Sequence, residues 1–205
     1  QKLNVATFNI RLKTPKDVAQ GDGWDQRKSV VTNIIRYHDF DVFGTQEVLQ
    51  PQLEDLLAGL PGYDYIGVAR IDGKQEGEYS AIFYKKDMLK VLDSGTFWLS
   101  TDTEKPNKGW DAKFPRICTW GKFQDKASKK VFWFFNTHFD HVGKVARSES
   151  AKLITAKIKA MAGKDPVILT GDFNVDQKNE CYTVMMSSGL MKDAYQCAEI
   201  RHAEN

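Results

Sequence analysis

The stretch Pro166-Val167-Ile168-Leu169-Thr170-Gly171-Asp172-Phe173-Asn174 is the most informative in this chain. Its first five residues form an apolar run that predicts a buried strand, and a Gly-Asp-x-Asn sequence follows directly. Short polar side chains at such a place usually form a turn, so the stretch alone is only suggestive. Three other apolar runs end in the same way, at Thr7-Phe8-Asn9, Gln46-Glu47 and Asn136-Thr137-His138. Four strands that each end in Asn, Asp, Glu or His indicate one shared site.

The bulk composition is that of an ordinary globular protein. The 205 residues are 41% hydrophobic, 12% aromatic and 27% charged, and they suffice for one sizeable domain over residues 1–205. No apolar run has the length of a membrane span. The net charge of +2, from 29 basic and 27 acidic residues, does not indicate a nucleic-acid binder, although a local basic patch would suffice for one.

The cysteines and the first residue leave the compartment open. Cys118, Cys181 and Cys197 form no CxxC pair and no cluster with histidine that would predict zinc. Cys118 lies in an apolar run and is expected in the core, whereas pairing of Cys181 with Cys197 stays open. The chain starts at Gln1 and not at Met, which fits removal of a leader from a secreted or periplasmic protein, or a cloning choice.

Periodicity predicts helices between strands at both ends of the chain and several short strands in the middle. This order indicates an α/β fold, α+β by some schemes, with two packed sheets. The run Val131-Phe132-Trp133-Phe134-Phe135 is apolar on both faces, as in a layered sandwich. The predicted strands are Leu3–Ile10, Asp41–Gln46, Tyr63–Ala69, Tyr79–Lys85, Leu89–Leu92, Thr96–Leu99, Ile117–Phe123, Val131–Thr137 and Pro166–Thr170; the predicted helices are Trp24–Tyr37, Gln50–Leu60, Lys144–Met161 and Lys178–Ser188, with a hairpin turn in Lys122–Lys130.

The residue types at the strand ends suit metal-assisted hydrolysis of a phosphate ester. Mg²⁺ usually takes one or two carboxylates plus waters and a phosphate; Glu47 can supply the carboxylate and Asn9 an amide oxygen. Asp172 can orient and deprotonate a water, and Asn174 can hold Asp172 or bond to the phosphate. His138 can donate a hydrogen bond to a phosphate oxygen whose charge grows in the transition state.

Each of these residues also has an ordinary structural interpretation. Asn9 alone reads as a turn residue, Glu47 as a solvated carboxylate and His138 as a hydrogen-bonded structural histidine. For Asp172 and Asn174 taken alone, the structural and the functional interpretation have equal weight. Their joint occurrence, each at a strand end, favours the site.

These blocks resemble the endonuclease/exonuclease/phosphatase superfamily, which has the deoxyribonuclease I-like fold. The matching blocks are Thr7-Phe8-Asn9-Ile10-Arg11, Thr45-Gln46-Glu47-Val48, Asn136-Thr137-His138 and Gly171-Asp172-Phe173-Asn174. The resemblance implies a four-layer α/β/β/α sandwich of two mixed sheets with outer helices. It also implies a phosphoesterase in which Asn9 and Glu47 hold Mg²⁺ or Mn²⁺, His138 contacts the scissile phosphate, Asn174 orients it and Asp172 activates the water.

The resemblance extends to further residues. Glu78 is similar to the acid that supports the site histidine, and Arg116 to a phosphate-contacting arginine; a loop carboxylate and a surface ion pair are their alternatives. Other stretches resemble an uncharacterised bacterial subgroup: Gly77-Glu78-Tyr79-Ser80, Gly95-Thr96-Phe97-Trp98-Leu99-Ser100, Gly109-Trp110-Asp111, Pro115-Arg116 and His138-Phe139-Asp140-His141-Val142-Gly143.

Three more residues near these motifs can reach a substrate. Asp140 and His141 either extend the site, with His141 on the substrate, or bind a second metal, or form a turn into the next helix. Arg11 is a candidate for substrate binding. Arg147, one turn into that helix, either reaches an anionic substrate or is solvated, and solvation is the favoured interpretation.

The chain departs from the family after Asn174. The family ends with a strand carrying Ser-Asp-His or a similar sequence, whereas His202 has no Asp before it and receives no role. Asp193, in the strand-like stretch Leu190–Ala194, is read as structural. The chain as given is therefore expected to lack its C-terminal strands and to expose a sheet edge, which invites pairing with another chain.

The sequence thus favours a divalent-metal-dependent phosphoesterase acting on a diester or monoester, and a monomer if complete. A non-catalytic binding protein on the same fold is the first alternative. A nuclease is the second, with Trp24, Arg11, Trp110, Arg116 and Lys144 as candidates to stack on bases and hold phosphates. Trp98 and Trp110 are also candidates to line a pocket for a small organic phosphate.

Overall fold

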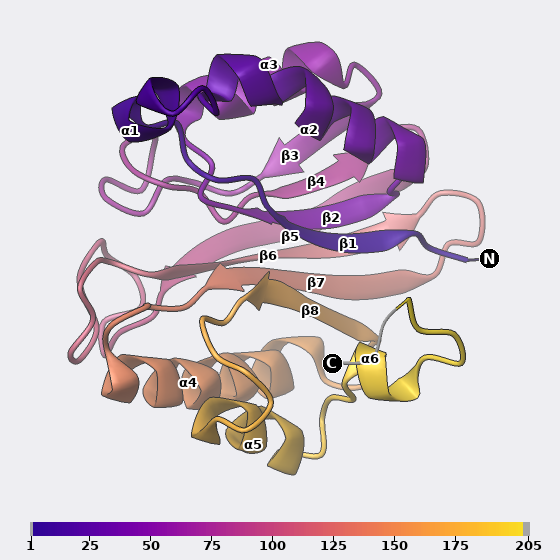
Figure 1. The fold of residues 1–205 in the computed structure, drawn as a ribbon. Coiled ribbons are helices and arrows are strands. Elements are labelled where there is room, and N and C mark those ends of the chain that lie inside the picture. The colour runs from indigo at the N-terminus through magenta and orange to yellow at the C-terminus, as the bar shows by residue number, and fades with distance from the viewer. Residues whose placement is uncertain (1, 203–205) are drawn as a thin grey trace.

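Two four-stranded sheets pack face to face between two layers of helices (Figure 1). The computed structural model describes residues 2–202. The predicted fold class, two mixed sheets with outer helices, is confirmed. Within the described residues no helix is long and apolar enough to cross a membrane.

The first sheet has the strand order β1-β2-β4-β3. Strands β1 (Val5–Asn9) and β2 (Val42–Gln46) are parallel, and β4 (Ile82–Lys85) and β3 (Tyr63–Ile66) continue the sheet in antiparallel fashion. Helices α1 (Pro15–Ala19), α2 (Trp24–His38) and α3 (Gln50–Gly59) lie on its outer side (Figure 1). The apolar faces of α2 and α3 and the sheet enclose a core that includes Ile35, Phe43 and Leu56.

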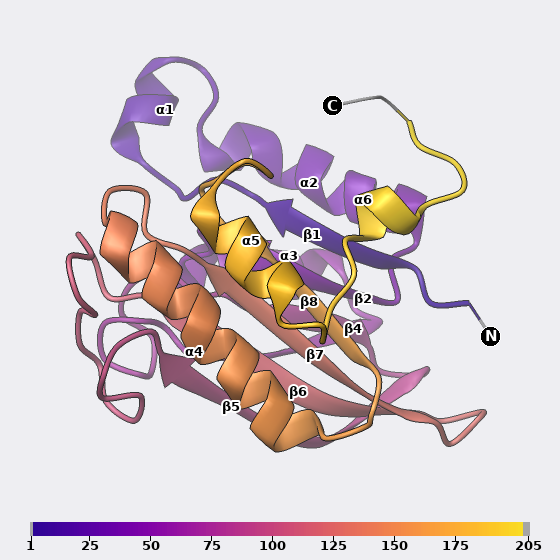
Figure 2. The same cartoon turned by 90° about the horizontal axis from the view of Figure 1, so that it is seen from below.

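The second sheet has the order β5-β6-β7-β8. Strands β5 (Leu89–Trp98), β6 (Ile117–Asp125) and β7 (Val131–His138) are antiparallel neighbours, and β8 (Val167–Asp172) runs parallel to β7. Helices α4 (Lys144–Ala162) and α5 (Glu180–Ser187) cross its outer face, and the short α6 (Ala194–Cys197) follows them (Figure 2).

The inner faces of the sheets meet over an apolar layer with one polar centre. Phe123, Phe132 and Phe134 fill much of the layer, as the doubly apolar run predicted. Asn136 is fully buried and its amide nitrogen donates to the carbonyls of Thr45 at 2.8 Å and Ala81 at 3.1 Å. Because these carbonyls belong to the other sheet or its flank, Asn136 ties the two sheets together.

Close approach at this point requires a glycine. A Cβ added to Gly44 would lie 2.2 Å from Asn136 Oδ1 and 2.3 Å from Thr170 Oγ1. Those distances are far inside van der Waals contact, so the sheets pack here only because residue 44 has no side chain.

Several local predictions differ from the structure. Leu89–Leu92 and Thr96–Leu99 are one strand, β5, with an irregular register between Val91 and Asp93. The stretch Leu190–Ala194 contains no strand; Asp193 instead caps α6, because its carboxylate accepts from Tyr195 N at 2.8 Å. Helices α1 and α6 were not predicted.

The three cysteines are unpaired. Cys118 is buried on β6, as predicted, and burial raises the pKa of its thiol. Cys181 is buried and Cys197 exposed, so the open question of their pairing is answered in the negative.

Candidate active site

The four predicted strand ends meet at one edge of the sandwich. Because β1 pairs with β2 and β7 with β8 in parallel, each pair brings two carboxyl-terminal ends to the same edge. A cavity of about 600 Å³ opens there. Its lining residues are Arg11, Leu12, Glu47, Arg70, Glu78, Phe114, Arg116, His138, His141, Asp172 and Asn174.

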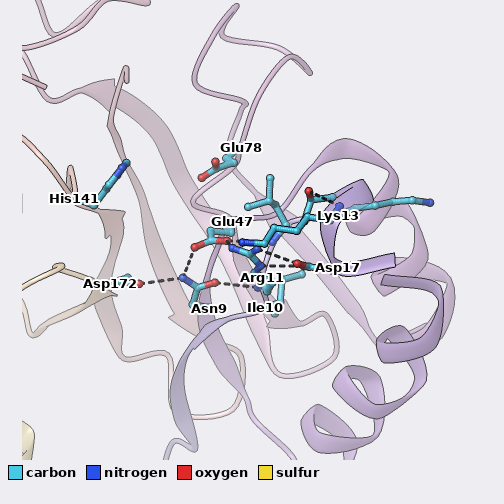
Figure 3. A network of polar contacts seen from close by, with 12 residues as sticks. Asn9, Ile10, Arg11, Lys13, Asp17, Glu47, Glu78, His141 and Asp172 are labelled. Atoms are coloured by element: carbon cyan, nitrogen blue, oxygen red, sulfur yellow. Dashed lines mark hydrogen bonds and ion pairs between the residues drawn. The ribbon is translucent and has the colours of Figure 1, made fainter. Parts of the chain in front are cut away.

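Asn9 connects the carboxylates of the two sheets (Figure 3). Its Nδ2 donates to Glu47 Oε1 at 2.9 Å and to Asp172 Oδ2 at 3.0 Å, while its Oδ1 accepts from the backbone N–H of Arg11 at 2.9 Å. The amide nitrogen, not the oxygen, therefore faces the carboxylates. The predicted use of the Asn9 oxygen as a metal ligand requires this amide to turn.

The backbone around the carboxylates adopts an uncommon conformation. Arg11, Glu47 and Asn174 have φ values of 62°, 61° and 52°. Asn tolerates this left-handed region, whereas Arg and Glu adopt it at a cost that the surroundings must offset. The Glu47 carboxylate accepts from Leu12 N at 3.2 Å, so the two strained segments hold one another.

Gln52, in the first turn of α3, supports the same two segments and was not predicted. Its fully buried side chain accepts from the N–H groups of Lys13 at 2.9 Å and Leu49 at 3.3 Å, and donates to the Arg11 carbonyl at 2.9 Å. Nothing in the sequence distinguishes it from an ordinary helix-start residue, because its partners become neighbours only after folding.

His138 lies between two carboxylates. Its Nδ1 is 3.7 Å from Glu78 Oε2 and its Nε2 is 3.8 Å from Asp172 Oδ2. Burial, reinforced by the charge of Arg116, lowers the His138 pKa to about 4. Nδ1 is buried and has no hydrogen-bond partner among the described residues. At neutral pH the imidazole is therefore uncharged and keeps a ring nitrogen unpaired.

Glu78 is held beside His138 by Arg70, which sequence reasoning missed. Arg70 Nη1 and Nη2 donate to Glu78 Oε2 at 3.0 Å and Oε1 at 2.9 Å, a bidentate pair with little exposure. Burial raises the pKa of Glu78, and the Arg70 guanidinium opposes that rise. Arg70 N also donates to the Glu78 carbonyl at 3.1 Å, so the loop itself brings the two residues together.

Arg116 and Asp140 form a second buried pair. Arg116 Nε donates to Asp140 Oδ2 at 3.2 Å, and both side chains are buried. The alternative interpretation of Arg116 as a member of a surface ion pair is therefore wrong. Asp140 Oδ1 accepts from the N–H groups of Val142 at 3.0 Å and Gly143 at 2.8 Å. Asp140 thus forms the turn into α4 and positions Arg116. His141, by contrast, lines the cavity, where its Nδ1 lies 3.1 Å from Arg116 Nη2.

Some predicted placements are wrong or lie away from the cavity. Arg147 was expected in solvent, but it is buried, and its Nη1 donates to the Asp140 carbonyl at 2.8 Å. Trp24 is fully buried and bonds to Asp55, and Trp98 is buried and bonds to the Arg70 carbonyl. Trp110 is exposed but does not line the cavity.

The donor set at the cavity floor fits a hard divalent cation. Glu47 supplies a carboxylate oxygen, and Mg²⁺ or Mn²⁺ commonly binds one or two carboxylates while keeping waters. Within residues 2–202 no three His, Cys, Asp or Glu side chains are grouped to hold a metal ion.

The fold and the cavity together define a class of proteins: two-sheet α/β sandwiches with a polar cavity at strand ends from both sheets. The model of the endonuclease/exonuclease/phosphatase family matches residues 6–180. This chain belongs to that family.

Solved structures and a curated relative refine the comparison. An endonuclease/exonuclease/phosphatase family protein from Bacteroides thetaiotaomicron superposes with a TM-score of 0.96 at 51% identity, over 99% of this chain and 74% of that chain. A mannosyl-6-phosphatase from the same organism superposes with a TM-score of 0.97 at 50% identity, over 100% and 77%. These matches confirm the predicted likeness to a bacterial subgroup.

An uncharacterised protein of Acanthamoeba polyphaga mimivirus is 30% identical over 162 residues, which are 76% of this chain and 60% of that protein. The chain thus spans about 60% of that curated relative.

Proposed function

We propose that this chain carries the active site of a divalent-metal-dependent phosphoesterase, and that sugar phosphate monoesters are its substrate class. One observation carries the proposal: Asn9 bonds to Glu47 and Asp172 together, at 2.9 Å and 3.0 Å, beside His138 in a cavity. The choice of a sugar monoester rests on the mannosyl-6-phosphatase that is 50% identical to the whole chain.

The assigned roles follow from position and chemistry. Glu47 would hold the cation together with the Asn9 oxygen, once the Asn9 amide has turned. The cation would neutralise phosphate oxygens and polarise the phosphorus centre. Asp172 Oδ2 accepts a proton from the attacking water as the new oxygen–phosphorus bond forms and the bond to the alcohol oxygen breaks. The leaving alcohol oxygen takes a proton from solvent water. Asn174 supports Asp172, since its backbone N–H donates to Asp172 Oδ1 at 3.0 Å.

The remaining residues bind the phosphate. Neutral His138 offers one N–H to a phosphate oxygen, and Glu78 orients its ring. Arg116 Nη1 is buried without a hydrogen-bond partner among the described residues, and it suits a phosphate oxygen. Arg11 lies at the rim, partly exposed and paired with Asp17 at 3.0 Å, and binds the substrate from there.

The test is phosphate release from mannose 6-phosphate and from a chromogenic phosphodiester, with Mg²⁺ or Mn²⁺ and with chelator. It is run on this chain and on the product of the complete gene. We expect metal-dependent release that Asp172→Asn lowers by at least 100-fold, because a cooperative catalytic group is lost. The matched control is Asp87→Asn, which removes an exposed carboxylate between β4 and β5.

Full activity in folded Asp172→Asn would show the mechanism to be wrong. No turnover by either protein, with sugar phosphate still bound, would favour the non-catalytic alternative. Faster turnover of the diester would move the substrate class toward diesters and nucleic acids.

A further inference from the structure

The cavity has two chemically different sides. Glu47 and Asp172 form one side with the hydrogen bonds around Asn9. The other side carries Arg70, Phe114, Arg116 and His141, which come from three separate loops. In Figure 3 His141 stands apart from the cluster around Asn9. The second side therefore extends beyond the carboxylates and can contact a further part of any ligand that reaches them.

The guanidinium groups on the second side are already paired. Arg70 is neutralised by Glu78 at 2.9 Å and Arg116 by Asp140 at 3.2 Å, and the four side chains are at most 15% exposed. Each of the two guanidinium groups therefore faces a carboxylate, and neither is a free surface cation. What the pairs provide is rigidity for the groups they touch.

Those groups are two rings. The Arg70 guanidinium lies 5.2 Å from the ring centre of Phe114, and the His141 ring lies 6.1 Å from it with an angle of 29° between the ring planes. Phe114 is 38% exposed although it is a large apolar side chain. An apolar surface held open at a cavity wall, beside polar groups, is typical of a ligand subsite.

The contact with Arg116 also fixes the proton of His141. A guanidinium carries only donors, so at 3.1 Å from Arg116 Nη2 the His141 Nδ1 must accept. The neutral ring therefore carries its proton on Nε2. No hydrogen bond to Nε2 is formed within residues 2–202, which leaves His141 with a donor of defined direction at the cavity wall.

Arg116 links this donor to the phosphate position. The same guanidinium fixes His141 through Nη2 and keeps Nη1 buried and unpaired, and Arg116 as a whole is 4% exposed. A ligand with its phosphate on Nη1 has its adjoining part beside His141 and Phe114.

From this geometry we infer that Phe114 and His141 form the subsite for the alcohol half of the substrate, and that they select a hydroxyl-bearing sugar ring. Phe114 packs against the C–H face of the ring, and His141 Nε2 donates to a ring hydroxyl. A site built to bond a hydroxyl discriminates against analogues that lack it. This inference rests on the proposed function and goes further by naming the residues that set specificity.

The test is the selectivity ratio, kcat/KM for a hexose 6-phosphate divided by kcat/KM for ethyl phosphate. His141→Phe keeps a ring and removes the donor, whereas His141→Gln restores an N–H near the same place. We expect His141→Phe to lower the ratio about 3- to 10-fold, mainly through KM for the hexose phosphate, and His141→Gln to recover part of it. Phe114→Leu should lower it by about 2- to 10-fold. His38→Phe, on the exposed side of α2, is the matched control.

An unchanged ratio in folded His141→Phe and Phe114→Leu would overturn the inference. The same ratio can be measured with a nucleoside 5′-phosphate in place of the hexose 6-phosphate. If only the nucleotide ratio falls in these variants, the subsite binds a planar base and the sugar assignment is wrong.

Failure of the proposed function gives a separate result. If the wild type hydrolyses neither phosphate, calorimetry of hexose 6-phosphate binding decides the subsite. Weaker binding by His141→Phe than by His38→Phe supports it, and equal or absent binding overturns it.

Discussion

Asn136 should be one of the most sensitive residues for stability, because its amide makes four hydrogen bonds, three to the other sheet or its flank and one to Thr170 on the neighbouring strand. Besides the two carbonyls that it donates to, its Oδ1 accepts from Gln46 Nε2 at 2.8 Å and from Thr170 Oγ1 at 3.0 Å. The side chain is fully buried. Asn136→Ala therefore removes one hydrogen bond from each of four groups that water reaches poorly.

The expected loss is smaller than the sum of four buried unpaired groups. Gln46 Nε2 retains Thr7 Oγ1 at 3.1 Å, Thr170 Oγ1 retains the Phe135 carbonyl at 3.3 Å, and the Ala81 carbonyl retains Thr45 N at 2.8 Å. Three groups thus lose one bond of about 1 kcal/mol each, and the Thr45 carbonyl loses its side-chain donor, so the free energy of unfolding should fall by about 3 to 4 kcal/mol.

The assay is urea denaturation followed by tryptophan fluorescence, with Asn33→Ala on the exposed face of α2 as the control. The expected loss corresponds to a fall in the thermal midpoint of roughly 10 °C. A loss in Asn136→Ala within 1 kcal/mol of the control would refute the reasoning, because the four bonds would then contribute little net stability.

Three further predictions concern packing and buried charge. Gly44→Ala should destabilise by about 3 kcal/mol or more by urea titration, since its Cβ would lie 2.2 Å from Asn136 Oδ1; a wild-type midpoint would contradict this. Arg70→Met should cost about 3 kcal/mol by leaving the Glu78 carboxylate, whose side chain is only 15% exposed, without its ion-pair partner, and adding Glu78→Gln should restore part of the loss; purely additive losses would show the pair to be uncoupled. Burial alone would raise the Asp140 pKa, but N–H donors at Gly143, Lys113 and Val142, together with Arg116, hold it well below its usual range. The lowered Asp140 pKa stabilises the folded protein above the unfolded pKa of about 3.9, and this contribution is lost as the pH falls below that value. The difference in thermal midpoint between wild type and Asp140→Asn should therefore narrow below about pH 4, and a constant difference would contradict this.

The strand-end motifs could be predicted because they depend on local sequence. Apolar runs in the sequence lead up to Asn9, Glu47, His138 and Asp172. These residues come together once the strands pair in parallel and their ends lie at the same edge. Side-chain alternation and strand length depend on a few consecutive residues. The sequence therefore predicts which candidate residues lie at strand ends.

Partners that meet only through folding could not be predicted. Arg147 looks like a solvated helix residue until the turn at Asp140 covers it and provides a carbonyl at 2.8 Å. Arg70 and Gln52 carry no motif, because Glu78 and the strained loops become their neighbours only in three dimensions.

The missed helices and the single strand β5 have a different cause. Helices α1 and α6 have five and four residues, too short for periodicity to show. The irregular register between Val91 and Asp93 breaks the alternation along β5, so the sequence predicts two strands where backbone pairing continues through one.

The measurement that tests the central claim most directly compares wild type with Glu47→Gln in phosphate release from mannose 6-phosphate across a Mn²⁺ titration. Glu76→Gln, an exposed carboxylate in the loop before Glu78, is the control. The account predicts that the wild type and the control respond to the metal alike, whereas folded Glu47→Gln needs far more metal or shows no turnover. Equal metal dependence and equal rates in all three proteins would contradict it.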